Sequence, residues 1–387
     1  MFWIFEIVKK GLKQDLNFID LYNILNEDSS ELLGNKLQKI WNNELINSEK
    51  KNQKPSFLYT LFKMFGSTFV FWGIYIAILE IILNISIGSI VRYIISYFES
   101  SSADNSIKIY LLIGLVILLV LRIVTFCVYE MAAAHLGMKI RIATSNLIYK
   151  KALRLKVSSM HQTSTGQILN LISNDVNRFD FGMILLPFLW IGPIETAVVT
   201  YFLWQEVSVS SLFGVSTLVM FIPLQLWLGS KKSGIRLKCA KRTDDRVHLM
   251  NEIISGLQAI KMYTWELFFD NIAKSSRKKE INEIKKSFYI NGISYSFILF
   301  NTRLALFVTL FVYILIGNNL TASKVFVITS YYYILQRLIQ LFLPSISVGA
   351  ESLVSVKRIE DFLLKEEKER QPKNLIKASD AKNTTIN

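Results

Sequence analysis

The sequence predicts an all-α membrane protein whose chain crosses the bilayer six times. Three observations lead to this fold class: long apolar runs, an alternation of short uncharged connectors with long basic ones, and a helical pattern inside the long connectors. The chain has 387 residues, of which 51% are hydrophobic, and its mean hydropathy is +0.35. Apolar residues in runs this long indicate membrane-spanning helices rather than the core of a large soluble protein.

Six segments are long and apolar enough to span the hydrocarbon layer, which takes roughly 20 residues of helix. In chain order they are residues 68–98, 107–129, 181–204, 209–228, 289–316 and 325–348. Five of them carry a charge near the middle. The two cysteines are too few for a disulfide framework.

The connectors predict the orientation of the chain. "ESSSADNS" at 99–106, "QEVS" at 205–208 and "GNNLTAS" at 317–323 contain no Lys or Arg. The N-terminal 63 residues, the connectors 137–180 and 229–288, and the tail after 351 are rich in both. By the positive-inside rule these four segments, and therefore both termini, face the cytosol. The formal net charge of +14 then reflects topology, and we expect no nucleic-acid partner.

The two long inner connectors are predicted to be helical stalks rather than loops. The first places Ile140, Ala143 and Leu147 at helical spacing. At about 1.5 Å per residue, a hairpin over 137–180 extends roughly 30 Å into the cytosol. On its returning arm, Ser164 and Thr165 are suited to cap a helix, and Gly166 allows a tight turn. Beyond them Ile168, Leu171, Ile172 and Val176 form one apolar stripe, while Asn170, Asn174 and Asn177 face elsewhere.

Several motifs, in a fixed order, resemble the first membrane domain of C-subfamily ABC exporters. These motifs are "DLYNILNEDSSELLGNKLQKIWNNEL" at 20–45, "TGQILNLISNDVNRFD" at 165–180, "FLWIGPIE" at 188–195, "MNEIISGLQAIKMYTWE" at 250–266 and "SVKRIEDFLLKEE" at 355–367. The family includes the multidrug-resistance-associated proteins and the cystic fibrosis chloride channel. The sequence is most similar to the short, type-four-like members, which lack an extra N-terminal membrane domain.

The resemblance implies a division of the chain into three parts. Residues 1–63 resemble the cytosolic lasso and elbow, 64–350 the six-helix ABC type-1 transmembrane domain, and 351–387 the linker toward a nucleotide-binding domain. The stalk tips, about 156–165 and 250–265, resemble coupling helices. The residues thereby expected to contact nucleotide-binding domains are Ser164, Thr165, Gly166, Gln167, Tyr263, Trp265 and Glu266.

The nucleotide-binding domains themselves are not in the sequence. A P-loop requires G-x-x-x-x-G-K-[ST], because its Lys and backbone amides hold the phosphates. The nearest match begins at Gly229 and ends at Gly234, but Ile235 and Arg236 follow, so the essential Lys is missing. We therefore expect no catalytic residue, metal or cofactor in this chain and no ATP hydrolysis by it alone. ATP and Mg would bind to nucleotide-binding domains, which with a second six-helix domain are the implied partners. The chain is either a truncated product or a half that needs those partners.

Five charged residues lie near the middle of predicted crossings: Glu80, Arg122, Glu195, Arg303 and Arg337. A charge at bilayer depth is costly, so it faces a partner or a cavity. One interpretation is that the two glutamates pair with two of the arginines. The other is a cationic cavity for anionic substrates, which the excess of arginine favours.

The sixth crossing gives the best local support for a substrate pathway. Ser330, Tyr333, Arg337 and Gln340 recur at three- and four-residue spacing, and Pro344 continues the row. This polar face should meet a water-filled pathway or another helix, because lipid would not satisfy it. A second, shorter face carries Arg122, Thr125 and Tyr129. The aromatic residues Phe188 and Trp190 could stack on an aromatic substrate, although ordinary packing is the favoured interpretation for both.

The predicted function is that of the membrane domain of an ATP-driven exporter of amphipathic organic anions, in contact with the lipid bilayer and expected in the plasma membrane. An anion channel, or a non-transporting regulatory subunit like the sulfonylurea-receptor branch, remains an alternative within the same family. A seven-helix receptor is disfavoured by the count of six crossings and by the length of the inner connectors. The first crossing departs from the family at 84–87, where Asn-Ile-Ser-Ile replaces a basic residue and a Gln-Pro pair. This departure argues against an identical set of substrates.

Overall fold

The computed structural model describes residues 2–17, 20, 22–99, 105–155 and 165–366. The elements of this part of the chain are helices. In order they are α1 (Phe2–Gly11), the 3-10 helix η2 (Asn26–Asp28), α2 (Ser30–Lys51), α3 (Phe57–Glu99), α4 (Asn105–Arg154), α6 (Thr165–Asn170), the π-helix η3 (Leu171–Asp175), α7 (Arg178–Leu185), α8 (Phe188–Val207), α9 (Ser210–Met220), α10 (Ile222–Ser255), α11 (Leu257–Met262), α12 (Glu266–Leu315) and α13 (Ala322–Leu363).

Six helical segments in the described residues are long and apolar enough to cross a membrane, which confirms the predicted fold class. They are Phe57–Phe98, Ser106–Arg154, Gly166–Val207, Ser210–Ser255, Glu266–Leu315 and Ala322–Leu363. All six extend well beyond the apolar cores that the sequence marks out, so the helices continue as the predicted stalks. The last helix runs on to Leu363, through the beginning of the expected linker.

The chain divides into two compact units, each of which combines parts distant in sequence. The first unit comprises Met1–Ile76, Phe126–Pro187 and Ser345–Asn387, of which the ranges given above are described. Its core contains Leu37 and Trp41 of α2, Phe57 of α3 and Ile148 of α4, each at most 3% exposed. One face of α2 is therefore buried against α3 and α4 within this unit.

Polar contacts attach the N-terminal and C-terminal segments of the first unit to the helices between them. Glu360 of α13 accepts a hydrogen bond, 2.7 Å long, from the backbone N–H of Phe57, a donor that has no partner within α3 because it is at the helix start. Asp28 Oδ2 lies 2.9 Å from His135 Nε2 of α4. Burial would raise the pKa of Asp28, but hydrogen bonds from His135 and Lys139 outweigh it and the pKa is lowered.

The third crossing and the stalk arm before it are not one continuous helix. The arm consists of α6, η3 and the start of α7, and the predicted crossing, 181–204, is divided between α7 and α8. The apolar stripe of the arm is directed inward as expected, with Leu171 and Val176 buried. The π-helix ends at Asp175, which is 1% exposed and accepts hydrogen bonds from Ser355 Oγ at 3.0 Å and Arg358 Nη1 at 3.1 Å. The break between α7 and α8 falls at Pro187, which has no N–H to continue the helix.

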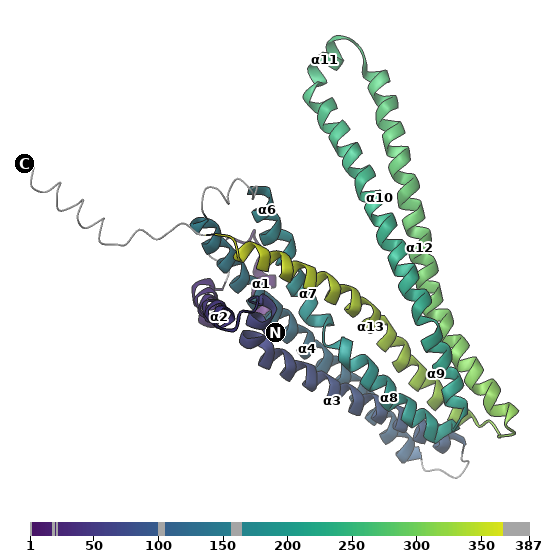
Figure 1. The fold of residues 1–387 in the computed structure, drawn as a ribbon. Coiled ribbons are helices and arrows are strands. Elements are labelled where there is room, and N and C mark those ends of the chain that lie inside the picture. The colour runs from purple at the N-terminus through teal and green to yellow at the C-terminus, as the bar shows by residue number, and fades with distance from the viewer. Residues whose placement is uncertain (1, 18–19, 21, 100–104, 156–164, 367–387) are drawn as a thin grey trace, which may run out of the picture. The chain divides into compact units, whose positions relative to one another are not determined.

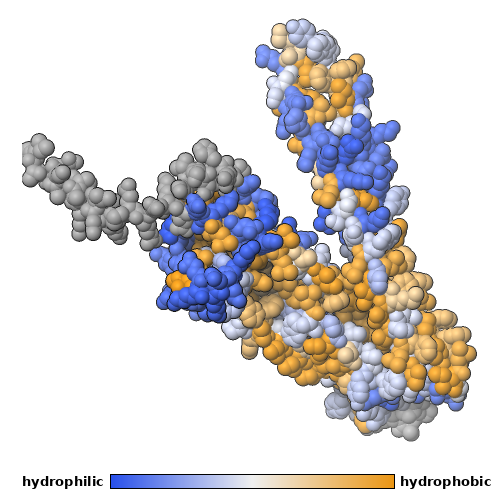
Figure 2. Space-filling model, in the orientation of Figure 1, coloured by the Kyte–Doolittle hydropathy of each residue, from blue (hydrophilic) through white to orange (hydrophobic). Residues whose placement is uncertain are grey.

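The second unit comprises Ala77–Thr125 and Phe188–Pro344. Its core lies between α8, α9, α12 and α13 and includes Leu203, Ala305, Ile328 and Tyr332. In Figure 1, α10 and α12 run side by side in opposite directions, with α11 at the far end of this hairpin. Figure 2 shows its surface as predominantly hydrophilic along the middle of the hairpin, mixed near α11 and hydrophobic toward α9, as expected for a stalk that leaves the bilayer.

Candidate substrate pathway

Glu80 of α3 and Arg337 of α13 form an ion pair within the apolar part of the second unit. The distance from Arg337 Nη2 to Glu80 Oε1 is 2.8 Å, and the two side chains are 28% and 4% exposed. An apolar environment of this kind favours pairing, because each isolated charge would lose its hydration without compensation. The structure thus agrees with the paired interpretation for these two residues.

Glu195 of α8 is held by an amide rather than by an arginine. Its Oε1 accepts a hydrogen bond from Asn84 Nδ2 of α3 at 2.8 Å, and the residue is 1% exposed. The atoms Glu195 Oε2 and Asn84 Oδ1 are buried without a hydrogen-bond partner in the described part of the chain. Asn84 belongs to the stretch where the sequence departs from the family, so this departure has a direct structural consequence.

Arg122 of α4 completes a group of four charges. It is half-buried, and it interacts electrostatically with Arg337, Glu80 and Glu195. Two arginines and two glutamates therefore lie in one region, and their formal charges cancel. Thr125, on the same face of α4, donates its hydroxyl to the backbone carbonyl of Leu121, so this donor is already used within the helix.

The fifth predicted charge, Arg303 of α12, makes a different contact. Its Nη2 donates to the hydroxyl oxygen of Tyr333 on α13 at 2.9 Å, and its guanidinium carbon lies 5.3 Å from the centre of the Tyr333 ring. Both residues are exposed. The sequence predicted each of them for the pathway separately, and the structure brings them together.

The predicted polar face of α13 is present as a row of accessible residues. Tyr333, Gln340 and Pro344 are exposed, and Ser330 and Arg337 are half-buried between them. The hydroxyl of Ser330 donates to the carbonyl of Phe326.

The aromatic pair in α8 is divided between two environments. Phe188 is buried in the helix interface, which is the ordinary packing that the sequence favoured, whereas Trp190 is 36% exposed. Tyr129 belongs to the first unit, where it is buried and donates its hydroxyl to the carbonyl of Ile184.

Two features of the second unit were not predicted. Arg92 of α3 and Glu206 of α8 form an ion pair of 2.5 Å near the C-terminal ends of their helices. The available signal was that Arg92 comes two turns before one short connector and Glu206 lies in another. An apolar cavity of about 260 Å³ also lies between α8, α9, α10 and α13, and no sequence motif indicated it. It is lined by Gly192, Pro193, Thr196, Val215, Leu218, Val219, Ile222, Leu335, Leu338, Ile339 and Phe342.

The second stalk tip presents aromatic side chains to solvent. The rings of Tyr263 and Trp265 stack with centroids 5.2 Å apart, and both side chains are more than half exposed. Lys261 and Glu266 bridge the turn at 3.0 Å. Within the predicted tip, 250–265, only α11 forms a separate short helix.

The first predicted tip lies largely outside the described residues. Ser164 is among those not described, Thr165 begins α6, and Gly166 and Gln167 are exposed.

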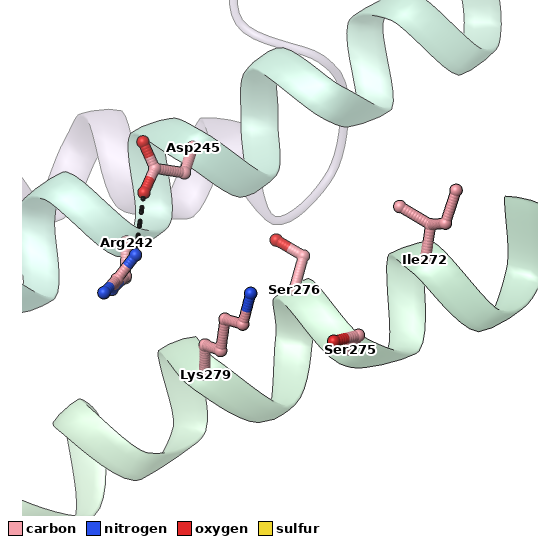
Figure 3. A pocket seen from close by; sticks show the side chains of 6 residues that line it. All are labelled: Arg242, Asp245, Ile272, Ser275, Ser276 and Lys279. Atoms are coloured by element: carbon pink, nitrogen blue, oxygen red, sulfur yellow. Dashed lines mark hydrogen bonds and ion pairs between the residues drawn. The ribbon is translucent and has the colours of Figure 1, made fainter.

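A polar pocket of about 220 Å³ lies between α10 and α12 in the stalk. Figure 3 shows the Lys279 amine and the Ser276 hydroxyl directed into the space between the helices, with the Arg242–Asp245 ion pair, 3.4 Å long, on the opposite side. Asp245 pairs with Arg242, so one of the two cations that line the pocket is already compensated.

Comparison with known proteins agrees with the predicted resemblance. The family described as the ABC transporter transmembrane region matches residues 41–339. ATP-binding cassette sub-family C member 4 of mouse and of human is 38% identical to the chain in each case, over 94% of this chain and 28% of the relative. A probable multidrug resistance-associated protein of Drosophila melanogaster, lethal(2)03659, is 34% identical over 95% of this chain and 27% of its own length.

The chain thus spans less than a third of the length of these relatives, and the likeness to C-subfamily exporters predicted from its motifs is confirmed. The family match covers most of the six helical segments and both units. The chain therefore belongs to the ABC transporter transmembrane region family.

Proposed function

We propose that the chain is the membrane domain of an ATP-driven exporter that moves amphipathic organic anions out of the cytosol. The observation that carries this proposal is the distribution of charge at bilayer depth: three arginines and two glutamates lie among apolar helices, which leaves one positive charge in excess. Such charges face a cavity or a partner, and a net positive cavity favours anions. The apolar surroundings would accept the hydrophobic part of the same molecule.

Transport would depend on domains that bind ATP and Mg and on a second six-helix domain. The exposed aromatic tip at Tyr263 and Trp265 supports docking of a nucleotide-binding domain there, because buried aromatic anchors dominate most interfaces. Closure of those domains would move the stalks, and the stalks would tilt the helices between inward- and outward-open states. In this proposal the protein is in the plasma membrane with both termini in the cytosol.

Uptake into inside-out membrane vesicles tests the proposal. The vesicles carry this chain assembled with its nucleotide-binding and second membrane domains, and the probe is an aryl sulfate with a long alkyl chain. We expect uptake with ATP but not with a non-hydrolysable analogue, and much less uptake of the uncharged parent alcohol. Equal uptake with ATP and the analogue would contradict an ATP-driven exporter, and equal uptake of sulfate and alcohol would contradict anion selectivity.

A further inference from the structure

The excess positive charge of the pathway belongs to one residue. Of the five charges near the middle of the crossings, Glu80, Glu195, Arg122 and Arg337 form the mutually compensated group described above. Arg303 is not in that group, and in the described part of the chain no carboxylate pairs with it. Its guanidinium keeps its full charge at any physiological pH.

The position of Arg303 makes an uncompensated charge unusual. It lies near the midpoint of the predicted crossing 289–316, roughly 18 Å along the helix from the end of α12 at Leu315, at about 1.5 Å per residue. An exposed guanidinium at this depth cannot face hydrocarbon without a cost of several kcal/mol. The face of α12 that carries Arg303 is therefore directed toward water or a polar partner.

Tyr333 holds this guanidinium at the polar face of α13. The hydroxyl accepts one N–H at 2.9 Å and the ring lies below the cation, so orientation is fixed while most of the five guanidinium donors stay available. Tyr333 is one turn from Arg337 on α13, and Arg303 thus reaches the same row of accessible residues. A planar fork with free donors is suited to a carboxylate, sulfate or phosphate oxygen pair.

We infer that Arg303, positioned by Tyr333, binds the anionic group of the substrate, and that Arg337 is a structural partner of Glu80. The inference rests on the proposed function and specifies which cation performs the recognition. The charge of Arg337 is already compensated by Glu80, whose Oε1 lies 2.8 Å from Arg337 Nη2. An anion approaching Arg337 would therefore have to displace a buried carboxylate. An anion approaching Arg303 would displace no carboxylate of the described part of the chain.

Equilibrium binding tests the inference on the assembled transporter in lipid nanodiscs, with the same aryl sulfate and its parent alcohol as probes. Arg303→Gln should raise the Kd for the sulfate by about 10- to 100-fold, the worth of a charge-assisted hydrogen bond, and that for the alcohol by less than about 3-fold. Arg303→Lys should recover part of the loss. Tyr333→Phe keeps the ring but loses the acceptor, so it should weaken sulfate binding by several-fold and leave alcohol binding unchanged.

The chain offers a matched control in the same two helices. Lys324 of α13 contacts Tyr313 of α12 through a 2.7 Å hydrogen bond and a cation–ring distance of 5.2 Å, but it lies near the start of α13. Lys324→Gln should leave the Kd for both probes within about 2-fold, since a peripheral charge has little effect at this distance. The double variant Glu80→Gln/Arg337→Gln should also retain sulfate binding.

Three results would overturn the inference: no change in sulfate binding with Arg303→Gln, an equal loss for sulfate and alcohol, or a selective loss of sulfate in the Glu80→Gln/Arg337→Gln variant. An equal loss accompanied by a lower thermal midpoint would instead make Arg303 a structural residue that pairs with another domain. Failure of the proposed function would be visible earlier, because the unsubstituted transporter would then bind the sulfate no better than the alcohol.

Discussion

Four of the five charged side chains near the middle of the predicted crossings lie together and compensate one another. Glu80 and Arg337 are separated by 257 positions in the sequence and meet at 2.8 Å. The sequence could show that both lie at bilayer depth, since each interrupts an apolar run. It could not show which glutamate meets which arginine, because that depends on the rotation of two packed helices. It also could not predict the hydrogen bond from Asn84 to Glu195, because an amide side chain in an apolar run can pair with many different groups.

The pairing of Glu80 with Arg337 predicts a specific pattern of stability. Arg337→Gln leaves a 4%-exposed carboxylate without its cation, which should cost on the order of 3 kcal/mol and lower the thermal midpoint of the purified chain. Glu80→Gln/Arg337→Gln replaces the pair by two neutral amides and should recover most of the loss. Thermal unfolding in detergent measures both variants. A double variant no more stable than the single one would show that the two residues are not energetically coupled.

Helix packing in the second unit depends on a close approach at Gly214 of α9. A Cβ added at this position would overlap both Thr309 Oγ1 of α12 and Tyr332 Oη of α13, which are hydrogen-bonded to each other at 2.5 Å. Small residues at such points allow membrane helices to come close, since packing is a main source of their association. The sequence located all three helices, but it gave no sign of which glycine lies at their crossing.

Gly214→Ala should therefore destabilise the chain by about 1–3 kcal/mol, as overpacking typically does. Gly292→Ala in α12 is the matched control, because nothing lies within 4 Å of a Cβ added there. Alanine favours a helix over glycine by about 1 kcal/mol, so this control should be neutral or stabilising. Thermal midpoints of the two variants decide the matter, and equal midpoints would contradict the packing described for α9.

The breaks in the membrane helices show what local sequence could and could not predict. One helix is interrupted at Pro187, and another is interrupted at Phe221, with Pro223 in the first turn of α10. Proline has no backbone N–H to donate, so both interruptions could have been predicted from the sequence. The π-helix at 171–175 was not, because its burial of Asp175 requires Ser355 and Arg358 from the other end of the chain. Periodicity alone predicted one regular helix there.

For the whole molecule, the asymmetry of Lys and Arg predicts which connectors face the cytosol. With Cys127 and Cys239 replaced by serine, a cysteine at the exposed position Asn319 should react with an impermeant thiol reagent in intact cells. A cysteine at the exposed position Lys278 should react only after permeabilisation. Labelling at Lys278 in intact cells would overturn the orientation, because that stalk would then lie outside.

Coupling between the membrane domain and ATP hydrolysis should depend on the second stalk tip. In the assembled transporter, Trp265→Ala should reduce the number of substrate molecules moved per ATP hydrolysed while substrate binding is retained, since loss of an interface anchor typically costs about 2 kcal/mol or more. Leu237→Ala is the control, as Leu237 is 71% exposed on α10 and distant in sequence from the tip. Parallel transport and ATPase assays give the ratio, and an unchanged ratio for Trp265→Ala would exclude this role.

An ATP-driven exporter moves its substrate against a concentration gradient, and the accumulation ratio of an amphipathic anion measures this property. Inside-out vesicles carrying the assembled transporter are supplied with ATP, the membrane potential is collapsed with an ionophore, and the aryl sulfate is measured inside and outside at steady state. An exporter concentrates the sulfate, so the internal concentration should exceed the external one and fall back when ATP is removed. A ratio that stops at one would contradict ATP-driven export and identify a channel. No entry of the sulfate above that of empty vesicles would identify a subunit that does not transport.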